Sequence, residues 1–256
     1  MSTDPIRPSH YTEPAPASPA VPAGAAGSSG YTVPADLVPP RPARIDALRY
    51  AARFTIVGLA LSIPLELISV VLTGMTAAFE PGPNLDDPLT LAATVELMVE
   101  AGVLIVTAVA FISWLYLAMK NIQGWRIAGL SWGPGWAIGG WLIPLANLVI
   151  PALVVNAAYK GSEAPAGRRY PGYGRPGLIV AWWLTFVIGG RLQNASGRDV
   201  SGQGVVYPVT YTTMEAALAI TAALLAIAIV RAITRLQSDR QAALDASQQD
   251  QMGPVS

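Results

Sequence analysis

The feature that most constrains this chain is a run of 33 residues without a charged side chain, from Ile127 to Tyr159. If fully helical, it would be roughly 50 Å long at about 1.5 Å per residue, which is long for one membrane crossing and short for two. Three prolines interrupt it, and a proline inside a helix removes a backbone hydrogen bond. They are Pro134, Pro144 and Pro151. The run therefore predicts a broken helical segment at or in a membrane.

Four other apolar segments accompany the broken one, which we place at about residues 134–159. They lie at about residues 54–79, 89–119, 176–192 and 212–234. Each approaches the roughly 20 residues that span a hydrocarbon core. Of all residues, 52% are hydrophobic and 12% charged, where a soluble chain carries about 25% charged residues. These features predict an all-α, multi-pass membrane protein.

The two ends of the chain differ from this apolar centre. Residues 1–43 contain ten of the 22 prolines, with alanine, serine and glycine between them. Such a segment cannot bury enough apolar surface to offset its chain entropy. We predict a disordered Pro/Ala-rich tail at 1–43, a helical membrane domain at 44–236 and a polar C-terminal tail at 237–256.

Composition also argues against several classes of function. The chain has no cysteine, and its single histidine, His10, lies in the proline-rich tail, so thiolate chemistry, histidine metal sites and a Ser-His-Asp triad are not available. No glycine-rich phosphate loop is present. The 16 basic residues balance the 16 acidic ones, so no positive field attracts nucleic acid. We expect no enzyme activity, no cofactor, no metal and no nucleic-acid partner.

The distribution of lysine and arginine distinguishes two topologies. If all five segments cross and the N-terminus is cytoplasmic, the basic residues near the membrane divide eight inside and seven outside. If the broken segment enters and returns on the cytoplasmic side, the division is thirteen to two, which the positive-inside rule prefers. We therefore predict four transmembrane helices plus a Pro-broken re-entrant or interfacial segment, with a cytoplasmic N-terminus. Five transmembrane helices are the alternative.

The prolines support the same prediction through the backbone. Pro144 cannot bond the carbonyl of Gly140, and Pro151 cannot bond that of Asn147. Freed backbone groups at membrane depth need protein, water or a polar side chain as partners. Because Asn147 lies one turn from each proline, we expect its side chain to supply that partner.

One stretch resembles a known family. Its pattern comprises Gly135-Trp136-Ala137, Trp141, Pro144 and Ala146-Asn147-Leu148, followed by Pro151. It is similar to the bacterial membrane family called domain of unknown function 4328, whose recurring signature reads approximately SPGWAVGWWFIPIANLxxPY. After Pro151 the family continues with an aromatic residue and a polar helix, whereas this chain is more apolar there. The resemblance covers about residues 50–235 and implies a multi-pass protein of the bacterial cytoplasmic membrane, without a known activity.

Charged side chains inside the apolar segments are the first candidates for function, because a charge at the bilayer centre costs on the order of 3 kcal/mol or more. Glu66 lies in the first segment, and Glu96 and Glu100 lie one turn apart in the second. The main expectation is that Glu96 and Glu215 lie at the outer interface, where Glu215 pairs with Arg191, and that Glu66 only hydrogen-bonds across the bundle in its neutral form. The alternative is a proton- or cation-accepting cluster in which Glu66 and Glu100 hold a shared proton.

Tryptophans are the second group of candidates. Those around the broken segment are Trp125, Trp132, Trp136 and Trp141. Tryptophan favours the headgroup region of a bilayer, so membrane anchoring is the main expectation. The alternative is a site for a lipid headgroup or another amphiphile, built from these rings with Arg126 and Lys160.

These features support two main functional hypotheses. In the first, the chain is a non-enzymatic scaffold or regulatory protein in the lipid bilayer, and its Pro-rich N-terminal tail and C-terminal helix bind protein partners. In the second, it is a small transporter or channel-like protein that uses Glu66, Glu96 and Glu100 near the broken helix. A membrane enzyme acting on lipids comes third, because only carboxylates and Asn147 could serve it.

Overall fold

The computed structural model describes residues 44–82, 84–127, 129, 131–163, 175–196 and 209–252. The regular elements in these ranges are all helical. In chain order they are α1 (Ile45–Phe79), α2 (Pro88–Gly124), α3 (Trp136–Leu142), the short 3-10 helix η1 (Ala146–Leu148), α4 (Ile150–Glu163), α5 (Pro176–Ser196) and α6 (Val209–Met252). The predicted disordered tail at 1–43 lies outside the described residues.

Three of these helices, α1, α2 and α6, are long and apolar enough to cross a membrane, and α5 contains a shorter apolar stretch, Pro176–Gly190. Large apolar side chains cover the outer surface of the bundle, for example Phe54 at 68% and Val106 at 67% exposure. Such a surface is stable in hydrocarbon and unfavourable in water. The prediction of an all-helical membrane protein is therefore confirmed.

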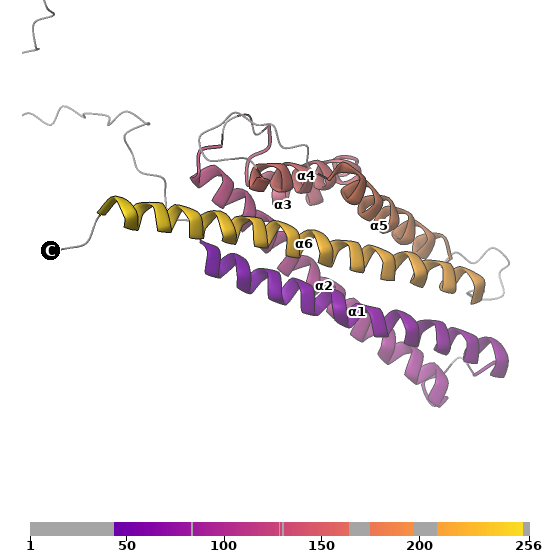
Figure 1. Cartoon of the computed structure of the whole chain (residues 1–256). Coiled ribbons are helices and arrows are strands. Elements are labelled where there is room, and N and C mark those ends of the chain that lie inside the picture. The colour runs from indigo at the N-terminus through magenta and orange to yellow at the C-terminus, as the bar shows by residue number, and fades with distance from the viewer. Residues whose placement is uncertain are drawn as a thin grey trace, which may run out of the picture. The chain divides into compact units, whose positions relative to one another are not determined.

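The long helices lie side by side (Figure 1). The most extensive contacts join α1 to α2, α1 to α6, and α5 to α6. A short turn joins α1 to α2, so these two helices are antiparallel. At this turn Glu80 ends α1 in a left-handed conformation with φ 44°, and Asp87 caps α2 through a 2.9 Å hydrogen bond from the Leu89 backbone nitrogen.

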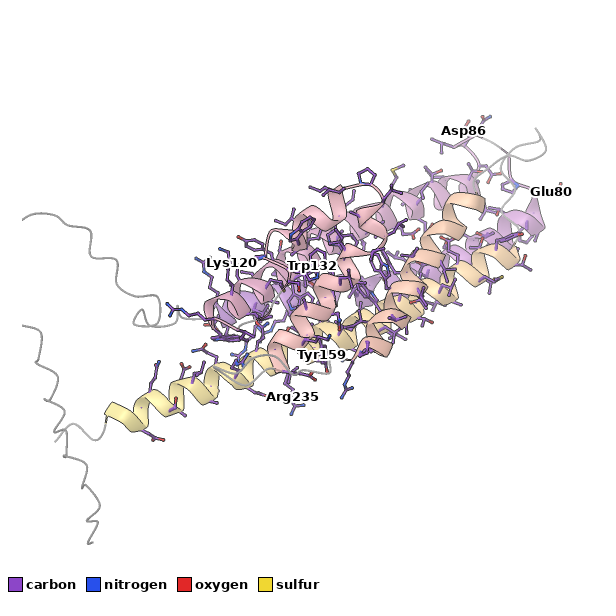
Figure 2. All side chains as sticks on the ribbon, turned by 90° about the horizontal axis from the view of Figure 1, so that it is seen from above. Glu80, Asp86, Lys120, Trp132, Tyr159 and Arg235 are labelled. Carbon is purple, nitrogen blue, oxygen red and sulfur yellow. The ribbon has the colours of Figure 1, made fainter. Side chains whose placement is uncertain are left out.

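Charge divides the bundle into two ends (Figure 2). Lys120 and Arg235 lie toward the end where α1 begins, which we call the arginine-rich end. Glu80 and Asp86 lie at the opposite end, around the turn between α1 and α2, which we call the acidic end.

The tightly packed core lies toward the arginine-rich end. Of α1 and α2, which the structure describes throughout, no residue of α1 after Gly58 and none of α2 before Thr107 is buried. At this boundary Gly58 packs directly against the side chain of Thr107. The largest fully buried side chains of the core include Leu48, Trp114, Leu115, Ile122, Val154, Val155 and Ile233. The halves of the helices toward the acidic end are packed less closely.

A buried polar network holds four helices together in this core. The side-chain oxygen of Asn121 accepts a 3.0 Å hydrogen bond from the backbone nitrogen of Arg44, and its amide donates to Gln237 at 3.0 Å. The amide of Gln237 donates to Ser162 at 3.0 Å and to the carbonyl of Ala118 at 3.1 Å. Because every member has a partner, the network stabilises the contact of α1, α2, α4 and α6.

The broken segment folds as a helical hairpin, α3–η1–α4. Ile143 is extended, with ψ 116°, as expected before a proline, and it ends α3. Leu145 then takes a positive φ of 66°. Pro151 is the second residue of α4, in the first turn, where a proline costs little. The chain therefore reverses at Pro144–Val149 and does not continue as one kinked helix.

Both arms of the hairpin belong to the arginine-rich half of the bundle. The arms contact each other where Gly140 packs against Ile150. Toward the end of α4, Gly161 packs against Ile122, close to the end of α2. The chain thus leaves α2, enters the hairpin and ends α4 at the same end of the bundle.

The expected role of Asn147 differs from the observed one. Its side chain is exposed and forms no hydrogen bond with the described residues. Instead, the indole nitrogen of Trp183 donates a 2.8 Å hydrogen bond to the carbonyl of Leu148. This carbonyl is neither of the two freed by the prolines, those of Gly140 and Asn147, and Trp183 reaches it because the reversal of the chain brings the hairpin turn against α5.

Candidate functional site

A cavity of about 330 Å³ lies among α1, α2, α3, α5 and α6. Most of its lining is aliphatic or aromatic, with Leu59, Leu104 and Ala222 as examples. A volume of this size falls within the range of small-molecule sites in proteins. The cavity lies where the close packing of the core ends.

Three glutamates from three different helices line this cavity. They are Glu66 on α1, Glu100 on α2 and Glu215 on α6, and each is half-buried. Among the described residues that line the cavity there is no lysine, arginine or histidine. A carboxylate away from water requires a proton or a cation as its partner. The described part of the cavity wall supplies no such cation.

Glu96 belongs to the same region but does not line the cavity. It lies one turn before Glu100 on α2, and one of its carboxylate oxygens is buried without a hydrogen-bond partner in the described part of the chain. Across the described ranges, no three acidic or histidine side chains come close enough to hold a metal ion.

Aromatic rings form the part of the wall nearest the arginine-rich end. Phe111 of α2 contacts Trp141 of α3 at 6.2 Å between ring centroids and Trp182 of α5 at 5.7 Å. Phe186 of α5 contacts both tryptophans, at 6.1 Å and 6.3 Å. These four residues, which we call the aromatic floor, lie between the glutamates and the core. Their ring faces can also attract a cation.

One polar group of the aromatic floor lacks a partner. The indole nitrogen of Trp141 is buried and forms no hydrogen bond within the described residues. Buried donors are almost always paired in proteins, and an unpaired one costs about 1–3 kcal/mol. Trp141 therefore places an unused donor in the wall of a cavity whose other polar side chains are the three carboxylates and the hydroxyls of Ser62, Thr107 and Thr185.

Comparison with known protein families identifies the family to which this chain belongs. A model of the family described as "Domain of unknown function (DUF4328)" matches residues 86–235, which is more than half of the chain. The chain belongs to the DUF4328 family. Neither the curated proteins nor the solved structures gave a match.

The DUF4328 match contains most of the cavity but not all of it. It begins just before α2, so Glu100, Trp141 and Glu215 lie inside it. Glu66 lies on α1, outside the matched residues. The three-glutamate cavity is thus shared between the DUF4328 region and the helix that precedes it.

The remaining candidates from the sequence lie in or near the hairpin. Pro144 and Asn147 are exposed at its turn, and Pro151 is buried in α4. Trp136 is 40% exposed and packs edge-on against Trp132 at 5.4 Å. None of these four candidates lines the cavity, whereas Trp141, Glu66 and Glu100 do.

Two features of the structure could not be predicted from the sequence. Glu215, which the sequence placed at the outer interface, lines the cavity together with Glu66, and the side chain of Arg191, its expected partner, lies outside the described ones. Trp125, which the sequence placed among the membrane anchors, is buried, and the guanidinium of Arg240 lies 4.9 Å from its ring centroid. The positions of Glu215 and Trp125 depend on contacts between helices that are distant in sequence, so the sequence alone could not predict them.

Proposed function

We propose that this DUF4328 protein is a non-enzymatic carrier that binds a small amphiphilic cation in the glutamate-lined cavity. The observation that carries the proposal is the presence of Glu66, Glu100 and Glu215 on one apolar wall that has no basic residue among those described. Apolar and aromatic walls favour the hydrocarbon part of such a ligand, and the carboxylates favour its charge. Protons can occupy the same carboxylates when the ligand is absent.

A lipophilic cation tests binding directly. Tetraphenylphosphonium should bind the purified protein in detergent, as measured by isothermal titration calorimetry. The Glu66→Gln/Glu100→Gln variant should bind at least about tenfold more weakly, since a buried charge pair contributes more than 1.4 kcal/mol. Glu80→Gln is the matched control, because Glu80 is exposed at the end of α1 and lies outside the cavity. Equal binding by the parent and the double variant would contradict the proposal.

Carriage requires a second measurement. Proteoliposomes containing the parent should take up ethidium faster than empty liposomes, and those containing Glu215→Gln should do so more slowly than the parent. Binding of tetraphenylphosphonium without any uptake of ethidium would limit the protein to binding and overturn the carrier part of the proposal.

The C-terminal half of α6 favours a second candidate function, a scaffold that binds a partner protein. Figure 1 shows α6 continuing past the start of α1, and its residues after Gln241 are mostly exposed. A polar helix outside the bundle is available for a partner. Deletion of residues 243–256 should remove a protein recovered with the parent by affinity purification. Recovery of the same proteins as with the parent, both after this deletion and after a separate deletion of residues 1–40, would exclude the scaffold function.

We propose a topology of four spans, α1, α2, α5 and α6, in a bacterial cytoplasmic membrane, with the hairpin re-entrant and the N-terminus cytoplasmic. The contact of Gly161 with Ile122, which brings the ends of α4 and α2 together, supports it, as does the position of Lys120 and Arg235 at one end (Figure 2). Topology reporters fused after residue 165 and at the C-terminus should both report cytoplasm. A report from outside at residue 165 would show instead that the hairpin region crosses the membrane.

A further inference from the structure

A second hollow lies between α1 and α6 near the arginine-rich end. It has a volume of about 440 Å³. Two arginines one turn apart on each helix line it, together with two hydroxyl side chains and two apolar residues: Arg49, Arg53, Arg231, Arg235, Thr234, Ser238, Ala52 and Ile56. No carboxylate is among these described lining residues. We call this hollow the arginine groove.

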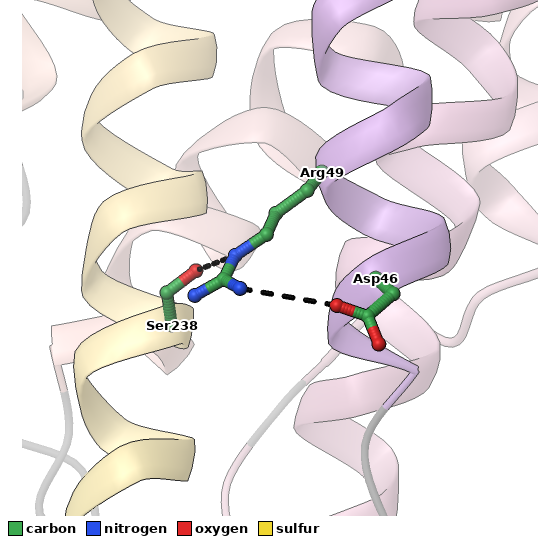
Figure 3. Close-up of polar contacts among 3 residues, drawn as sticks. All are labelled: Asp46, Arg49 and Ser238. Atoms are coloured by element: carbon green, nitrogen blue, oxygen red, sulfur yellow. Dashed lines mark hydrogen bonds and ion pairs between the residues drawn. The ribbon is translucent and has the colours of Figure 1, made fainter.

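The two helices are held together across the arginine groove by one of these arginines. The Nε of Arg49 donates a 3.1 Å hydrogen bond to the hydroxyl of Ser238 on α6 (Figure 3). Its guanidinium also lies 3.8 Å from Asp46, and that of Arg235 lies 3.8 Å from Asp239. Both carboxylates are strongly exposed, so these pairs are weak and easily exchanged.

The other two arginines have no ion pair in the described part of the chain. Arg53 lies over the ring of Tyr50 at 5.8 Å, and Arg231 has no polar partner among the described side chains. Four arginines line one hollow, and their like charges disfavour this arrangement unless an anion lies between them. Guanidinium forms two parallel hydrogen bonds with a phosphate, which makes phosphate the anion of choice for such a site.

The surroundings of the arginine groove favour a lipid as the source of that phosphate. Directly after Arg53, the surface of α1 is apolar, with Phe54 at 68% and Val57 at 56% exposure. The arginines therefore lie where the apolar, lipid-facing surface of α1 gives way to charge, which is the level of the headgroups. A lipid bound there places its phosphate in the groove and its acyl chains along α1. A soluble phosphate has no apolar part that could bind to that surface.

We propose that the arginine groove is a binding site for the phosphate headgroup of an anionic phospholipid. This site is separate from the glutamate-lined cavity, since the two hollows share no residue. Basic pockets between transmembrane helices are suited to such headgroups because charge and geometry act together. The bound lipid links α1 to α6 in addition to the bond between Arg49 and Ser238.

Native mass spectrometry of the full chain measures this binding. The protein is titrated with phosphatidylglycerol and, separately, with phosphatidylcholine of the same acyl chains. The parent should bind phosphatidylglycerol the more tightly, and Arg53→Gln/Arg231→Gln should weaken that binding about tenfold or more. The control variant Lys120→Gln/Arg175→Gln removes the same amount of charge outside the groove. It should change the affinity for phosphatidylglycerol by about twofold at most. Arg53 and Arg231 are both exposed, so the Arg53→Gln/Arg231→Gln variant should keep the melting temperature of the parent in phosphatidylcholine.

Further variants and competitors make the result decisive. Arg53→Lys/Arg231→Lys keeps the charge but cannot pair in the two-pronged manner of arginine, so it should bind with intermediate affinity, and it serves as the test if the glutamine variant is unstable. Equal losses in the groove variant and the Lys120/Arg175 control would show diffuse attraction and overturn the proposal. Stabilisation by millimolar inorganic phosphate equal to that by phosphatidylglycerol would show a soluble anion as the ligand and overturn the lipid.

Discussion

The indole nitrogen of Trp183 lies 2.8 Å from the carbonyl oxygen of Leu148 and joins α5 to the turn of the hairpin. Trp183→Phe keeps a ring of similar kind but removes the donor. In the proposed re-entrant topology the carbonyl would then lack a partner, which costs about 1–3 kcal/mol. We expect the free energy of unfolding, measured by denaturant titration in detergent, to fall by that amount.

Trp132→Phe is the control for this change. Trp132 is partly buried and packs edge-on against Trp136, and its indole forms no hydrogen bond in the described structure. Its substitution should alter the free energy of unfolding by less than about 1 kcal/mol. Equal effects of the two substitutions would show that the bond to Leu148 does not hold the hairpin in place.

Two asparagines of this chain should differ sharply in their contribution to stability. Asn121 is buried and binds the backbone of Arg44 and the amide of Gln237. Asn147 is exposed, and its side chain forms no hydrogen bond among the described residues. Asn121→Ala should therefore lower the free energy of unfolding by about 2 kcal/mol or more, and Asn147→Ala by less than about 0.5 kcal/mol. Thermal unfolding of both variants in the same detergent checks the contrast, and a reversed order would refute it.

A pair of glycines on α1 offers a matched test of the packing. A Cβ on Gly58 would collide with Thr107 of α2, whereas nothing lies within 4 Å of a Cβ on Gly74. Gly58→Ala should destabilise the protein by about 1–3 kcal/mol, because the two helices must separate. Gly74→Ala should be neutral or stabilising by up to about 1 kcal/mol, since alanine favours a helix. The melting temperatures of the two variants should move in opposite directions or differ by several degrees.

The cap of α2 should make stability depend on acidic pH. Hydrogen bonds from the backbone nitrogens of Leu89, Thr90 and Gly82 hold the pKa of Asp87 below its ordinary value of 3.8. Because the folded-state pKa is the lower one, this contribution is fully present above the ordinary value and is lost as the pH falls through the folded-state value.

Asp87→Asn removes this titration but can still cap the helix. We expect the melting temperature of the parent to fall more steeply than that of Asp87→Asn as the pH is lowered below about 4. Asp86→Asn should follow the parent, since Asp86 makes no such bond in the described structure. Parallel curves for the parent and Asp87→Asn would show that this cap does not contribute.

The sequence was sufficient for those parts of the fold that depend on local composition. Membrane helices require long apolar runs, and a proline imposes its own backbone geometry, so the broken segment with Pro144 and Pro151 could be located. The exact number of spans is a different question, because it depends on which side of the membrane each charge lies. A sum over lysines and arginines addresses it only indirectly.

Contacts between distant elements could not be predicted in the same way. Asn147 is near both prolines in sequence, yet its side chain bonds no described residue, and a side chain from α5, Trp183, bonds the hairpin turn at Leu148, 35 residues earlier. Similarly, the helical spacing of Glu96 and Glu100 is visible in the sequence, but the convergence of Glu66, Glu100 and Glu215 on one cavity depends on how three helices pack. Charge and periodicity identify candidates, and tertiary packing selects among them.

The aromatic floor also affects the route by which protons can reach the cavity glutamates. On α2, Phe111 lies between Glu100 and Lys120, so the rings separate the carboxylates from the arginine-rich end. Aromatic side chains exclude water, and protons move between carboxylates and solvent only along water or polar groups. We therefore expect the glutamates to equilibrate with the compartment at the acidic end alone. Such one-sided protonation would make the bundle responsive to acidity on a single face of the membrane.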